Sequence, residues 1–112
     1  MQPEVIVTPL VEPLTDVTRA HLRSTIRKEM ARGNLFHVVD LSKLDHLDAG
    51  TLSELIRVRR WLREVGGMLS LVADQPNILK ILTIAGLDRV FGVYRSDRDA
   101  ITALNHSNLI PA

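Results

Sequence analysis

The sequence contains no cysteine and few aromatic residues, and each shortage excludes a class of site. Without cysteine, the chain forms neither a disulfide framework nor a thiolate metal site. Aromatic residues make up only 4% of the chain, so we expect no platform of stacked rings for nucleic acid. No run approaches the roughly 20 apolar residues that a membrane-spanning helix requires, and we expect no signal peptide. We therefore expect a cytoplasmic protein.

The chain also lacks a strong charge of either sign. Its 14 lysine and arginine residues nearly balance 13 aspartate and glutamate residues, which leaves a formal net charge of +1. Such a charge gives no long-range attraction to nucleic acid or to an acidic membrane surface, so we expect neither as a partner. The expected oligomeric state is a monomer or a weak dimer.

Length and hydrophobic content indicate one folded domain. The chain has 112 residues, 46% of them hydrophobic, which is enough for an ordinary core. We expect a single domain over residues 1–112, with its core between about residues 5 and 104 and a short C-terminal tail over residues 105–112.

Apolar segments separated by turn residues predict alternating strands and helices. The predicted strands cover residues 5–7 with 10–11, 35–41, 68–73 and 91–94, and the predicted helices cover residues 16–31, 49–65, 77–85 and 97–104. Side chains that can accept hydrogen bonds from free amides stand at three helix starts, and glycines follow three helix ends. The alternation predicts an α/β fold with a mostly parallel central sheet and about four helices.

The most informative segment joins the second predicted strand to the second predicted helix. Asp40-Leu41-Ser42 ends the strand, and Asp48-Ala49-Gly50-Thr51-Leu52 begins the helix after a short polar connection. Asp48 stands at the N-cap, where a carboxylate can bind free amides and complement the positive end of the helix. Exposed junctions of this kind often carry function.

These residues resemble the signature of the STAS domain, the fold of bacterial anti-sigma factor antagonists. That signature reads roughly Asp-Leu-Ser, a short spacer, then Asp-Ser-Ser-Gly-Leu, and both parts fall at matching positions here. Thr18 also stands where the family often has threonine. The second matching block comprises Gly66-Gly67, residues 68–73, Pro76, residues 80–87 and Val90-Phe91. The resemblance covers residues 5–104 and implies the STAS fold.

The resemblance also implies a function. Anti-sigma factor antagonists bind an anti-sigma factor, a kinase-like ATPase, and so free a sigma factor for transcription. The alternative within the same family is a STAS subunit that regulates the ATPase of a lipid-transport assembly. The family usually has a further strand ahead of the first one predicted here, so we expect a shorter or differently covered sheet edge.

Position 50 departs from the pattern of regulated family members. In those proteins the anti-sigma kinase phosphorylates the serine immediately before the motif glycine, and here Gly50 aligns with that serine. Because glycine has no hydroxyl, the resemblance implies that the phosphorylation switch is absent or displaced to Thr51 or Ser53. The alternative for Thr51 is a first-turn residue that satisfies a backbone amide. The expected partner-binding residues are Asp48, Gly50, Thr51, Leu52 and Ser53.

Acidic and histidine residues near the junction do not form a recognisable catalytic or metal motif. Asp45, His46 and Asp48 are close in sequence, but catalysis requires paired groups in tuned environments and metals require more convergent ligands. Capping and solvation account for these residues, and no glycine-rich phosphate loop is present. We therefore expect no enzyme activity, no cofactor and no metal.

Arginines gather on two predicted helices. Three of them share one face of the first helix and four crowd the second: Arg19, Arg23 and Arg27, then Arg57, Arg59, Arg60 and Arg63. Such runs usually form a solvated face, and the alternative is a rim that docks an acidic partner. Trp61 lies among them, either as core filler or as an interface anchor.

Overall fold

The computed structural model describes residues 4–105. Four strands form one sheet in the order β1-β2-β3-β4, and all three neighbouring pairs are parallel. The strands are β1 (Val5–Pro9), β2 (Phe36–Asp40), β3 (Met68–Val72) and β4 (Gly92–Tyr94). The helices are α1 (Asp16–Ala31), α2 (Ala49–Glu64), α3 (Pro76–Ile84) and α4 (Asp97–Asn105), with a short 3-10 helix, η1 (Leu87–Arg89). The predicted α/β fold is confirmed.

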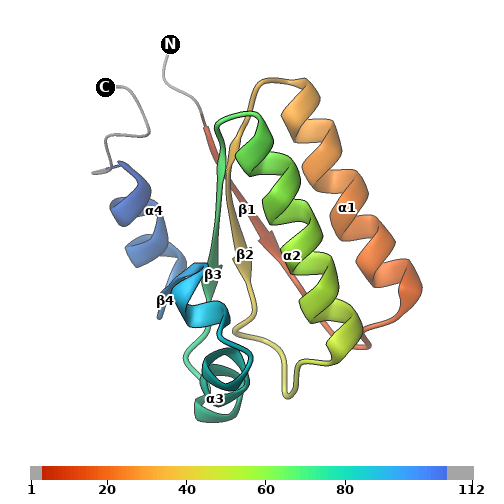
Figure 1. Ribbon diagram of the computed structural model, residues 1–112, viewed down its shortest axis with the longest axis vertical. Helices are drawn as coiled ribbons and strands as arrows, with labels where there is room; N and C mark the ends of the chain where they lie inside the picture. Colours follow the sequence, from red (N-terminus) through yellow and green to blue (C-terminus); the bar gives the residue numbers. More distant parts are fainter. Residues whose placement is uncertain (1–3, 106–112) are drawn as a thin grey trace.

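The helices cover both faces of the sheet. Figure 1 shows α1 and α2 side by side on one face, α4 on the other, and α3 beyond the end toward which the strands run. Each face has its own apolar core because alternate strand residues point to opposite sides. Val39 and Leu71 belong to the larger core under α1 and α2, whereas Val38 and Val72 pack with Ala100 of α4.

The predicted helix boundaries agree closely with the structure. Thr15 accepts a hydrogen bond from the amide of Thr18, and Ser96 accepts one from the amide of Asp99. α3 begins at Pro76, one residue earlier than predicted, because proline suits the first helical position. Most of the predicted C-terminal tail lies outside the described residues, and its first residue, Asn105, ends α4.

Pro9 and Pro13 predict that the first strand is an edge strand or is interrupted, and β1 is an edge strand. Pro9 does not interrupt it, because Pro9 is the last residue of β1 and is in register with Asp40. The following residue, Leu10, continues toward β2, since its amide donates to the carbonyl of Asp40 at 2.9 Å. Proline is tolerated there because β1 is an edge strand and needs no donor on its outer side.

Candidate functional site

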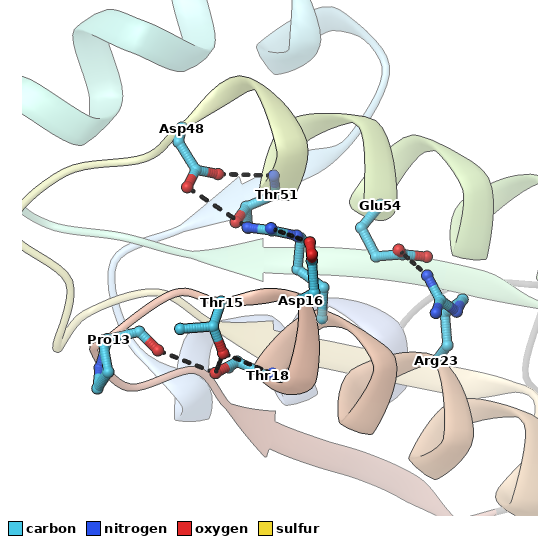
Figure 2. Close-up of polar contacts among 9 residues, drawn as sticks. Pro13, Thr15, Asp16, Thr18, Arg23, Asp48, Thr51 and Glu54 are labelled. Carbon is cyan, nitrogen blue, oxygen red and sulfur yellow. Dashed lines mark hydrogen bonds and ion pairs between the residues drawn. The ribbon is translucent and has the colours of Figure 1, made fainter.

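Asp48 holds the start of α2 in place. Its backbone is extended, and its Oδ1 accepts a hydrogen bond of 2.7 Å from the amide of Thr51 (Figure 2). This hydrogen bonding from Thr51 holds the pKa of Asp48 below its usual value of 3.8. Asp48 is therefore ionised at neutral pH and neutralises the positive end of the helix.

Gly50 is exposed and lies directly under the guanidinium group of Arg19. A Cβ at position 50 would stand 3.2 Å from Arg19 Cζ. Arg19 in turn bridges two carboxylates, with Nη2 2.6 Å from Asp16 Oδ1 and Nη1 3.5 Å from Asp48 Oδ2. The hydrogen bond and charge of Asp16 raise the pKa of Arg19, so the bridge stays charged. Arg19 thus joins the first turn of α1 to the first turn of α2.

The expected site residues divide into exposed and buried positions. Ser53 is exposed, Asp48 and Leu52 are half-buried, and Thr51 is completely buried. No hydrogen bond to the Thr51 hydroxyl is formed within the described part of the chain. The interpretation that this hydroxyl satisfies a backbone amide is therefore wrong: Asp48 performs that task, and Thr51 packs beneath the surface.

The exposed face of α2 continues from Ser53. This face consists of Ser53, Ile56, Arg57 and Arg60, which line a shallow depression of about 270 Å³. Ile56 is 40% exposed although it is a large apolar residue. Neither arginine forms an ion pair with another described residue. We call these four residues the α2 face.

Two arginines of α1, Arg19 and Arg23, are partly buried and pair with acidic residues of the α2 region, so the prediction of a solvated face is wrong for these two, whereas Arg27 is exposed. Arg23 pairs with Glu54, which is 5% exposed, and the Arg27 guanidinium lies 4.6 Å from the centre of the Trp61 ring. Arg19, Arg23 and Arg27 recur at every fourth residue, so they follow one stripe of α1 that contacts α2. That spacing was visible in the sequence, but their partners on α2 were not.

The loop before α1 lies beside this site (Figure 2). The Thr18 hydroxyl donates to the carbonyl of Pro13 at 2.9 Å, which ties the loop to the first turn of the helix. Glu12 accepts a hydrogen bond of 2.6 Å from the amide of Asp45 in the connection that leads to α2. The two helix starts are thereby joined by hydrogen bonds between side chains and backbone as well as by Arg19.

The acidic residues near the junction do not converge with His46 on a metal site among the described residues. His46 is well exposed, with Nδ1 3.9 Å from Glu12 Oε1. Between residues 4 and 105, no group of three histidine, aspartate or glutamate side chains converges as metal ligands would. In the same range, no helix has the length and apolar character needed to cross a membrane.

Comparisons with known proteins agree with this architecture. The protein BtrV of Bordetella bronchiseptica, named as an anti-sigma factor antagonist, is 28% identical over 82 residues, which are 73% of this chain and 71% of BtrV. An anti-sigma factor antagonist from Mycobacterium paratuberculosis has a crystal structure with a TM-score of 0.77 and 26% identity, covering 94% of this chain and 92% of the other.

A third relative has the same fold at lower identity. SpoIIAA of Bacillus in its phosphorylated form gives a TM-score of 0.71 with 20% identity, covering 90% of this chain and 91% of SpoIIAA. At that identity only the fold is shown. The sequence profile of the STAS domain matches residues 1–100. This chain therefore belongs to the STAS domain family.

Proposed function

We propose that this protein is an anti-sigma factor antagonist, which binds a kinase-like anti-sigma factor and so frees a sigma factor for transcription. Two relatives that resemble it over most of their length carry that name. The observation that carries the proposal is the exposed start of α2, where Gly50 and Ser53 lie at the surface next to the N-cap Asp48.

The proposed contact surface extends from this start along the α2 face. Asp48, Gly50, Leu52 and Ser53 form its beginning, and the α2 face continues it. Ile56 supplies exposed apolar area. Arg57 and Arg60 have no ion-pair partner between residues 4 and 105, so their charges favour an acidic patch on the partner. Thr51 contributes to this surface indirectly, because its buried side chain supports the first turn of α2.

We propose that the usual phosphorylation switch does not operate at position 50. A relative of this fold, SpoIIAA, has been solved both phosphorylated and unphosphorylated, but Gly50 offers no acceptor. Thr51 is a poor substitute because its side chain is buried. Ser53 is the better candidate for a displaced acceptor, because it is exposed. Arg57 lies one turn further along α2 and would attract a phosphate there.

A binding experiment tests the proposal. The protein is used to capture its partner from a cell lysate, and mass spectrometry identifies that partner. Affinity for the purified partner is then measured by calorimetry for the natural protein and for Ser53→Arg. We expect the partner to be an anti-sigma factor and the substitution to weaken binding by at least about tenfold.

The matched control is Ser24→Arg, the same substitution at an exposed position of α1. It should leave affinity unchanged. If a transporter ATPase is captured, the alternative STAS role is correct. If both variants bind as tightly as the natural protein, the contact surface lies elsewhere.

A further inference from the structure

A cavity separate from the depression on the α2 face lies at the edge of the sheet, where β4 begins later than β3. In the strand register, Ser70 is the first residue of β3 with a partner in β4, whereas Met68 and Leu69 pair only with β2. This late start leaves a notch beside the first residues of β3. The notch opens into a cavity of about 370 Å³ whose lining includes the last turns of α2 and the Gly66-Gly67 turn.

Two glycines, Gly67 and Gly92, border the notch. A Cβ at Gly67 would stand only 2.3 Å from the carbonyl oxygen of Leu35, so only glycine fits this close approach. Gly92 has no side chain either, and the Tyr94 ring lies across it, with Cε2 2.9 Å from the ideal Cβ position. The cavity is thus bordered by bare backbone and by one aromatic ring.

Two arginines of α2 contribute the charge of this cavity. Arg59 and Arg63 lie one helical turn apart, and neither forms an ion pair with any residue in the range 4–105. Burial, followed by the charge of Arg63, lowers the pKa of Arg59 from its usual value. Two like charges at this spacing repel each other. An anion between them would relieve that repulsion.

A buried hydroxyl also lines the cavity. Ser70 of β3 is 2% exposed and is one of the residues that line the cavity. Ser70 thus places a hydroxyl on the β3 side of the cavity, in addition to the guanidinium groups on the α2 side.

We propose that this cavity binds a small organic oxyanion, a carboxylate or phosphate monoester attached to an apolar body. The guanidinium groups of Arg59 and Arg63 bind the oxyanion, and the Ser70 hydroxyl donates a further hydrogen bond. The apolar body packs against Met68, Val90 and Tyr94. The cavity volume lies within the range of small-molecule sites. The site is at the opposite end of α2 from Asp48, so it does not depend on the proposed partner contact.

Amide chemical shifts of the ¹⁵N-labelled full chain provide the test. Phenyl phosphate, benzoate and inorganic phosphate are titrated separately, so that the phosphate and carboxylate sources are distinguished. We expect phenyl phosphate, benzoate or both to bind with a dissociation constant on the order of 0.1–1 mM. The shifts should be confined to residues 66–70 and 90–94.

The variants separate a specific site from general attraction to positive charge. Arg59→Gln/Arg63→Gln should weaken binding by at least about tenfold, and Ser70→Ala by a smaller factor. Arg57→Gln/Arg60→Gln removes the same charge from the same helix outside the cavity and should leave binding unchanged. The proposal is overturned if neither organic probe shifts these amides at about 10 mM, if both double variants lose affinity equally, or if inorganic phosphate binds as tightly as phenyl phosphate.

Discussion

The ion pair between Arg23 and Glu54 joins α1 to α2, and removing one partner tests how much it stabilises the fold. The Glu54 side chain is 5% exposed and that of Arg23 is 34% exposed. Arg23→Met keeps the aliphatic stem but leaves the buried carboxylate without its cation. Breaking a buried pair costs about 3–5 kcal/mol. Water can approach through the partly exposed Arg23 position, so we expect a loss of about 2–3 kcal/mol in the free energy of unfolding.

Urea unfolding followed by circular dichroism measures this loss. In Arg23→Met/Glu54→Leu both charges are gone, and an apolar pair should recover most of the stability. The control is Arg32→Met, because Arg32 is 65% exposed in its pair with Glu29 and should contribute less than about 0.5 kcal/mol. The reasoning is refuted if Arg23→Met is no less stable than the control, or if the double variant is as unstable as the single one.

Two further predictions concern phosphorylation and pH. Incubated with its anti-sigma kinase and ATP, the natural protein should stay unmodified at position 50, whereas Gly50→Ser should gain phosphate and bind at least about tenfold more weakly. Intact-mass and calorimetric measurements check this, and stoichiometric phosphate on Ser53 would contradict loss of the switch. Burial lowers the pKa of His37 below 6.5 in the folded protein. As pH falls, His37 therefore takes up a proton more readily in the unfolded chain than in the folded one, and the free energy of unfolding should decrease below about pH 6.5. Urea unfolding measured at several pH values should show a smaller decrease in stability for His37→Phe than for the natural protein. An equal decrease in the two proteins would contradict this prediction.

The helix boundaries were predictable because their signals act over a few neighbouring residues. Thr15, Asp48 and Ser96 all accept an amide hydrogen bond at the predicted helix starts. Gly33 and Gly66 follow the predicted ends with φ values of +86° and +81°, a backbone conformation that favours glycine. Such local signals needed no knowledge of the rest of the chain.

The candidate site was predictable only in part. The sequence located the exposed start of α2 at Asp48 and Gly50, but Thr51 was expected at the surface and is buried. Burial depends on how α2 rotates against the sheet, and residue spacing near a helix start defines that rotation poorly. Arg19 and Arg23 were misinterpreted for a similar reason, since charge alone does not show whether a side chain faces solvent or a neighbouring helix.

By itself, the sequence determined the α/β class, the order of the elements and the residues that begin and end each helix, because apolar periodicity and capping are local properties. Only the tertiary structure decided which residues of different elements contact each other. Arg19 reaches Asp48 and Arg23 reaches Glu54 across about 30 positions in the chain, and the notch beside β3 exists because β4 pairs with only part of it. These features depend on packing between distant segments, so they appear only once the sheet is assembled.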